Sequence, residues 1–134
     1  MEEKLKKNYV FFGMQPVLPA RDVAETIAYY INVLGFSFDF AYGDPPEHGR
    51  VYYGDPDDGS AIRIQFTEDL QGKTEVPTAG WITIHVESDI EDLFEEYKSR
   101  GAKIAAELET YPWGLKEFEV QDCNGHILRF AAEA

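Results

Sequence analysis

The chain has 134 residues, a length typical of one domain that buries its own core. Its 25 acidic and 12 basic side chains give a net charge of −13, which disfavours nucleic acid and anionic membranes as partners and attracts cationic ligands. No stretch approaches the ~20 apolar residues of a membrane span, the start MEEKLKKNY is not a secretory signal, and the single cysteine has no internal partner. We therefore expect a cytoplasmic location.

The first half of the sequence predicts one helix among several strands, after a flexible leader at residues 1–8. Residues 9–20 are apolar and predict a strand, which Pro16 and Pro19 restrict to a sheet edge or an irregular end. Apolar side chains at helical spacing then predict a helix that Asp22 caps and Gly35 ends. Alternating side chains predict further strands at 36–42, 50–55 and 61–68.

The second half repeats this order after a loop at 69–80. Residues 81–87 predict a strand, and Ser88 with Glu91 forms a capping-box pattern at the start of a helix that ends at Gly101. Further strands are predicted at 102–109, 116–122 and 126–132. The pair Asn124-Gly125 is a strong hairpin signal between the last two strands.

Each half thus predicts the order strand, helix, strand, strand, strand. The fold class is α+β, with two βαβββ modules at 9–68 and 79–134 in one domain. A module of this size is too small to bury its sheet alone, so the two must pair. Two curved mixed sheets joined in this way would enclose a cleft, where binding sites commonly form.

Three blocks of the sequence carry a resemblance to a known family: QPVLPARDVAETIAYYINVLGFSFDF, GWITIHVESDIEDLFEEY and YPWGLKEFEVQDCNGHILRF. Together they resemble the glyoxalase/bleomycin resistance protein/dioxygenase superfamily, also called the vicinal oxygen chelate superfamily. The last block, with PWG before EF and a D-x-x-G turn, resembles the bleomycin resistance proteins in particular. The resemblance implies the paired βαβββ fold.

Metal-using members of this superfamily hold a divalent ion with four side chains, two from each half. The matching positions here are Gln15, Gln65, Trp81 and Arg129. An indole has no lone pair to give, and a guanidinium is a fixed cation that repels the ion. We therefore expect no metal and no other cofactor. A shifted site that uses Glu117 or Glu119 stays open.

Other catalytic chemistry has little support in the sequence. His48 lies in a predicted loop, His85 on a strand and His126 after a turn glycine, with no spacing typical of a metal site. Cys123 lies in a tight turn without a histidine at a motif spacing, where a solvated thiol is expected. We assign no catalytic residue, and we favour a protein that is not an enzyme.

Aromatic side chains suggest what a metal-free cleft would bind, because flat rings stack on flat ligands and attract cations. Trp113 lies between Pro112 and Gly114 in a turn, where burial in the core is less natural. In the bleomycin resistance proteins, residues that match Trp113, Trp81, Asp39 and Phe40 line a crevice between two subunits. We add Tyr52, Gln65 and Arg129 to the candidate ligand-binding residues. Arg129 either pairs with a neighbouring acid or binds an anionic ligand.

The leading hypothesis is a homodimeric, metal-free protein that binds and sequesters a planar, cationic small molecule, for example a bleomycin-type antibiotic. Nucleic acid and membranes are not expected as partners. One alternative is a metal-dependent enzyme of the superfamily, acting as a lyase, an isomerase or a ring-cleaving dioxygenase. Another is a subunit whose exposed aromatic residues contact a different protein.

Overall fold

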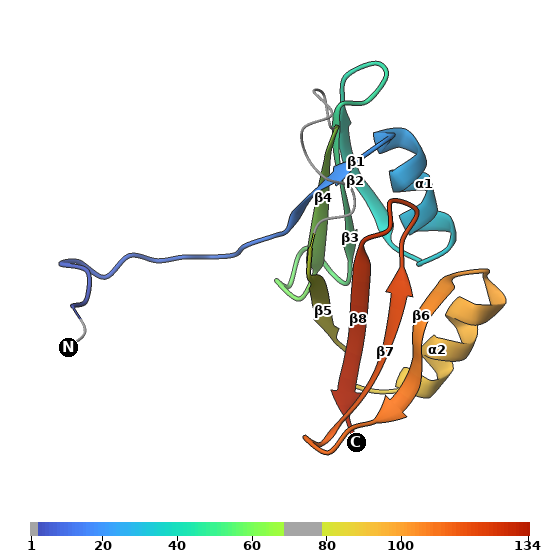
Figure 1. Ribbon diagram of the computed structural model, residues 1–134. Helices are drawn as coiled ribbons and strands as arrows, with labels where there is room; N and C mark the ends of the chain where they lie inside the picture. The colour runs from blue at the N-terminus through green and yellow to red at the C-terminus, as the bar shows by residue number, and fades with distance from the viewer. Residues whose placement is uncertain (1–2, 69–78) are drawn as a thin grey trace.

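The computed structural model describes residues 3–68 and 79–134 (Figure 1). The first module has five elements in the predicted order: β1 (Val17–Ala20), α1 (Val23–Asn32), β2 (Ser37–Tyr42), β3 (His48–Tyr53) and β4 (Ile62–Glu68). The second repeats it: β5 (Trp81–His85), α2 (Ile90–Ser99), β6 (Lys103–Thr110), β7 (Leu115–Gln121) and β8 (Ile127–Glu133). The fold is therefore α+β with two βαβββ modules, as the sequence predicts.

Each module forms one mixed four-stranded sheet. The strand orders are β1-β4-β3-β2 and β5-β8-β7-β6, so the first strand of each module pairs in parallel with the last. Both helices lie on the same side of the molecule, and none of the described residues forms a helix on the opposite faces of the two sheets (Figure 1). These open faces are where side chains from several strands can meet a ligand.

Alternation along the strands decides which side chains reach the open faces. In the first sheet, Val51, Ile64 and Phe66 are buried in the core, and Gly49 lies so close to Ile27 of α1 that an added Cβ would clash. In the second sheet, the core-facing rings are those of Phe118 and Phe130, which pack against Phe94 and Tyr97 of α2. The residues between these positions therefore point to the open faces.

Buried polar contacts join the two modules. The Tyr30 hydroxyl on α1 donates to an Asp122 carboxylate oxygen at 2.6 Å, in the turn between β7 and β8. In the same turn, Asn124 donates to the Thr26 hydroxyl at 2.9 Å, and His126 Nε2 donates to the Pro19 carbonyl at 2.8 Å. Burial, reinforced by Asp122, raises the pKa of Tyr30 well above its usual value, so the phenol stays a donor.

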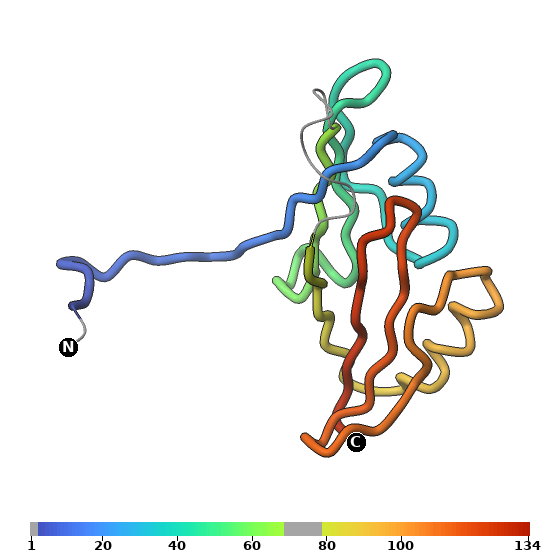
Figure 2. Tube along the Cα trace, viewed as in Figure 1, coloured from blue at the N-terminus to red at the C-terminus, as the bar shows by residue number. Residues whose placement is uncertain are grey.

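The first strand is shorter than the sequence predicts. A strand was expected over 9–20, but β1 begins only at Val17, and residues 3–16 contain no helix or strand. Gln15 and Pro16 still contact Gln65 of β4, but the N-terminal arm before them, residues 3–14, runs away from the rest of the chain (Figure 2). Its apolar side chains are exposed, with Phe12 and Met14 at 101% and Val10 at 88%.

Two smaller expectations are also wrong. The capping box of Ser88 and Glu91 does not form, because Asp89 is the N-cap residue and makes no side-chain cap bond. His48 was expected in a loop but begins β3, where its ring Nδ1 lies 3.1 Å from the Thr67 hydroxyl. The loop predicted at 69–80 lies outside the described residues except for its last two positions.

Candidate functional site

The candidate residues fall into two groups, one on the open face of each sheet. We call the first group face A, formed by Gln15, Asp39, Phe40, Arg50 and Gln65. We call the second group face B, formed by Trp81, Trp113, Glu117, Glu119 and Arg129. The hydrogen bonds and ion pairs described for these residues fall within one group or the other, so the two groups are separate in a single chain.

Arg50 organises face A. Its Nε donates to Asp39 at 2.8 Å and its Nη1 donates to the Gln15 side-chain oxygen at 2.9 Å. Its guanidinium lies over the Phe40 ring, 4.9 Å from the centroid. Gln15 in turn donates to the Gln65 side-chain oxygen at 2.6 Å. Face A is therefore a connected polar network, in which the arginine is matched by one carboxylate.

Tyr52 belongs to the same open face by strand alternation, since it lies two residues after Arg50 on β3. It is partly exposed and pairs across the ladder with Ser37 and Arg63. Tyr52 thus extends face A along the sheet without joining the network that Arg50 holds together.

Arg129 organises face B. Its guanidinium is bound by Glu119 and lies 3.5 Å from Glu117, and it stacks over the Trp81 ring at 4.3 Å from the centroid. The register explains this grouping, because Arg129 on β8 lies between Thr83 of β5 and Glu119 of β7. The expected pairing of Arg129 with a neighbouring acid is confirmed, and two carboxylates take part in it.

Trp113 is held by one of these two carboxylates, that of Glu117. Its indole Nε1 donates to Glu117 at 2.9 Å, and one ring face is stacked on Tyr111, with centroids 4.6 Å apart and planes 11° from parallel. Gly114, at φ 90°, allows the tight turn that places the indole there. The ring remains 62% exposed, so its outer side is accessible. A chain of contacts thus runs from Trp113 through Glu117 and Arg129 to Trp81.

Four of the residues that build or support these faces were not among the sequence-predicted site residues. Arg50 was not singled out, because a lone cation on an alternating strand resembles a solvated surface residue. Glu117 and Glu119 were considered only as substitute metal ligands, although the alternation of KEFEV places them on one face. Tyr111 carried no signal beyond its place before the turn.

The residues at the metal positions of the superfamily do not fit a divalent ion. Gln15 and Gln65 bond to each other through their amides, and Arg129 supplies a positive charge where a ligand would have to donate electrons. Across the described residues, no group of three or more His, Cys, Asp or Glu side chains is arranged to hold a metal ion. Glu117 and Glu119 are engaged by Arg129 and Trp113.

Cys123 is a poor nucleophile in this setting. The residue is exposed, but partial burial of the thiol raises its pKa, and its sulfur lies 3.9 Å from the Thr26 hydroxyl. His126 is buried, and its ring Nε2 bonds to the Pro19 carbonyl at 2.8 Å.

Comparison with known proteins fits this architecture. The family model of the glyoxalase/bleomycin resistance protein/dioxygenase superfamily matches residues 13–130, so the chain belongs to that superfamily. A search of the curated proteins finds no significant match. No helix of the described residues is long and apolar enough to cross a membrane.

Among solved structures, the bleomycin-binding protein of bleomycin-producing Streptomyces verticillus, in complex with copper(II)-bleomycin, is 26% identical, with a TM-score of 0.72. The similarity covers 95% of this chain and 100% of that one. A glyoxalase-related enzyme from Clostridium phytofermentans is 23% identical over 96% of this chain and 100% of its own, with a TM-score of 0.77. TioX from Micromonospora sp. ML1 is 21% identical over 90% of this chain and 98% of its own, with a TM-score of 0.68. The last two similarities concern the fold alone.

Proposed function

We propose that this protein binds and sequesters a planar, cationic small molecule in a crevice where face A of one subunit meets face B of another. The observation that supports this most is the contact chain Trp113–Glu117–Arg129–Trp81. These contacts hold two indole rings on one face, beside the carboxylates of Glu117 and Glu119.

Each indole keeps one accessible side. Trp113 rests on Tyr111 and is 62% exposed, while Trp81 rests on Arg129 and is 56% exposed. Because one side of each ring is already packed, the rings lose little freedom when a ligand stacks on the other side. Planar ligands are the class that benefits most from such surfaces.

The charge of face B favours a cation. Two carboxylates, Glu117 and Glu119, surround the single Arg129, so the group carries a formal charge of −1 and the arginine is not available to recruit an anion. The protein's net charge of −13 adds long-range attraction for a cationic ligand, which raises its association rate at low salt.

A second copy of the chain would complete the site. Within residues 3–68 and 79–134, no helix covers either open face, and the N-terminal arm exposes Phe11, Phe12 and Met14 to solvent. Contiguous apolar groups of this kind mark interaction surfaces. A two-fold homodimer would bring face A of each subunit to face B of the other, giving two equivalent crevices. Exchange of the arm about Pro16 would bury its apolar side chains.

A bleomycin-type antibiotic is the most specific ligand we propose. The bleomycin-binding protein of Streptomyces verticillus has the same fold over nearly the full length of both chains. The drug combines planar heteroaromatic rings with positive charge, which are the two features that face B would recognise.

Tryptophan fluorescence tests this proposal, because Trp81 and Trp113 are the two tryptophans of the chain and both lie on face B. Titration with metal-free bleomycin should quench the emission and saturate at tens of micromolar or below. Absence of quenching in that range would exclude bleomycin as the ligand. Sedimentation should show a dimer at micromolar concentration, and a monomer that still binds the drug would contradict the interfacial crevice.

A further inference from the structure

A cavity of about 760 Å³ lies between the two modules. None of the seven candidate ligand-binding residues on faces A and B lines it. We call it the seam cavity, and its volume is in the range of small-molecule sites, roughly 300–1,000 Å³. It is complete within one chain, whereas the crevice described above needs two.

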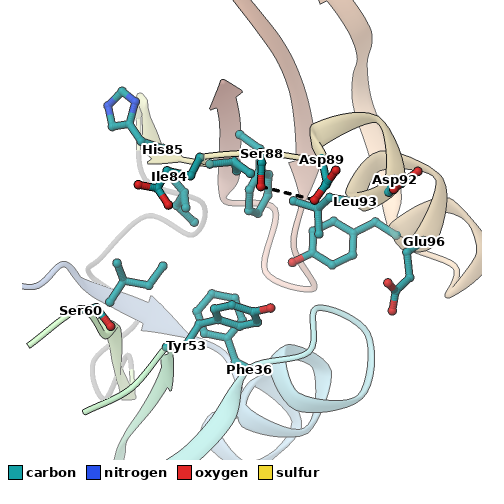
Figure 3. A pocket seen from close by; sticks show the side chains of 16 residues that line it. Phe36, Tyr53, Ser60, Ile84, His85, Ser88, Asp89, Asp92, Leu93 and Glu96 are labelled. Atoms are coloured by element: carbon teal, nitrogen blue, oxygen red, sulfur yellow. Dashed lines mark hydrogen bonds between the residues drawn. The ribbon is translucent and has the colours of Figure 1, made fainter. Parts of the chain in front are cut away.

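Part of the wall of the seam cavity is apolar and aromatic. Phe36, Tyr53 and Ser60 of the first module lie opposite Ile84 and Leu93 of the second (Figure 3). The ring centroids of Phe36 and Tyr53 are 5.7 Å apart, and the two rings meet edge to face. Tyr53 is 56% exposed, so part of this wall is accessible to an entering molecule. Such rings can pack on an apolar group and attract a nearby cation.

Among residues 3–68 and 79–134, the charged side chains that line the cavity are acidic: Glu87, Asp89, Asp92 and Glu96. The other titratable side chains that these residues contribute to the lining are those of His85, Tyr53 and Tyr97. Glu96 is paired with Arg100 on the next turn of α2, at 3.0 Å. No ion pair is found within 3–68 and 79–134 for the other three carboxylates.

Asp89 has an unusual backbone at this site. It is the single non-glycine residue with positive φ in the described segments, with φ 60° and ψ 34°, and it starts α2 without capping it. Its carboxylate accepts a bond from the Ser88 hydroxyl at 3.3 Å (Figure 3). A left-handed aspartate that does not cap its helix gives up a stabilising contact and costs backbone energy. In this conformation Asp89 lies in the lining of the cavity.

We propose that the seam cavity is a second, separate binding site, for an organic cation with an aromatic or apolar body, such as a hydrophobic primary amine. The apolar body would lie between Phe36, Tyr53 and Leu93, and the ammonium group would lie near the carboxylates of Asp89 and Asp92. The same carboxylates would disfavour an anion, and the apolar side chains would disfavour a ligand with polar groups at both ends.

Nuclear magnetic resonance titration with 4-phenylbutylamine tests this proposal, with 4-phenylbutanol as a neutral probe of similar shape. We expect the amine to shift the backbone signals of Tyr53, Ser88 and Leu93 and to bind at least fivefold more tightly than the alcohol. Equal binding of both probes, or amine shifts confined to Trp81 and Trp113, would overturn the proposal. So would the absence of shifts at millimolar amine.

Variants sharpen this test. Asp92→Asn should weaken amine binding at least twofold, whereas Glu95→Gln, which removes an exposed charge from the same helix outside the cavity, should leave it unchanged. Tyr53→Ala should weaken binding of both probes. If the signals of the cavity lining shift with protein concentration in the absence of probe, a second copy fills the cavity and the proposal is wrong. Failure here leaves the function proposed for face B untouched, since that is read from tryptophan quenching.

Discussion

The two modules have the same order of elements, yet corresponding parts of them are built differently. Asp22 caps α1 by accepting from the Glu25 amide at 2.9 Å, whereas Asp89 leaves α2 without a side-chain cap. Face A is an amide and arginine network with one carboxylate, whereas face B holds two indoles and two carboxylates around an arginine. The shared periodicity thus maintains the fold, and the differences between the modules lie on the two faces that we propose as binding surfaces.

The largest expected difference between the faces concerns their arginines. Arg129→Met would leave the Glu117 carboxylate, 9% exposed as a side chain, without its cation, and we expect a loss of about 2–4 kcal/mol in the free energy of unfolding. Arg50→Met should cost about 1 kcal/mol, because the Asp39 side chain is 27% exposed and water compensates for the lost partner. Urea unfolding measures both. Equal losses would show that the two networks are energetically alike.

Removing the outer indole should affect binding more than stability. Trp113→Ala removes a side chain that is 62% exposed. The substitution should weaken bleomycin binding by more than ~1 kcal/mol, or about fivefold in affinity. Tyr53→Ala removes an aromatic ring of similar exposure from the seam cavity and is the matched control. An unchanged affinity in Trp113→Ala would mean that the turn tryptophan has a structural role only.

The helix caps should differ by about 1 kcal/mol. Asp22→Ala removes a formed cap and should lower the free energy of unfolding by about that amount. Asp89→Gly removes no cap and places glycine in a left-handed conformation that suits it, so we expect no loss. Thermal unfolding of both variants measures the difference. A clear loss in Asp89→Gly would indicate that this carboxylate stabilises the helix after all.

Much of the fold could be predicted from periodicity, but the site could be predicted only in part. Helical spacing and strand alternation placed both helices and seven of the eight strands, within a few residues at their ends, because burial acts on every turn of the pattern. The strand at 9–20 was overextended, since apolar residues such as Phe11 and Phe12 look alike whether they join a sheet or lie exposed on an arm. The predicted cap of α2 is wrong because Asp89 adopts a left-handed backbone conformation that its residue type does not dictate.

The side-chain contacts of face B could not be predicted from the sequence. The Trp113–Glu117 bond and the position of Arg129 over Trp81 depend on the turn geometry and on the register of β5 with β8. Neither contact produces a periodic pattern in the sequence. The pairing of Arg129 with an acid was foreseeable from charge alone, whereas the identity and number of the acids were not.

The smallest expected effect separates the two carboxylates of face B. Glu117→Leu removes the acceptor that holds the Trp113 indole, so bleomycin affinity should fall by about 0.5–1 kcal/mol and Trp113 emission should shift to longer wavelength. Glu119→Leu leaves the indole bond in place and serves as control, with little change in the emission. Identical spectra for the two variants would show that Glu117 does not orient the indole.

The most direct test of metal-free binding is a calorimetric titration of the chelator-treated protein with Ni²⁺, Zn²⁺, Mn²⁺ and Fe²⁺. Since an amide pair and a guanidinium stand where ligands would be needed, we expect no ion to bind at one per chain with micromolar affinity. One ion bound tightly per chain, lost on replacing Glu117 or Glu119, would contradict this account and point to an enzyme.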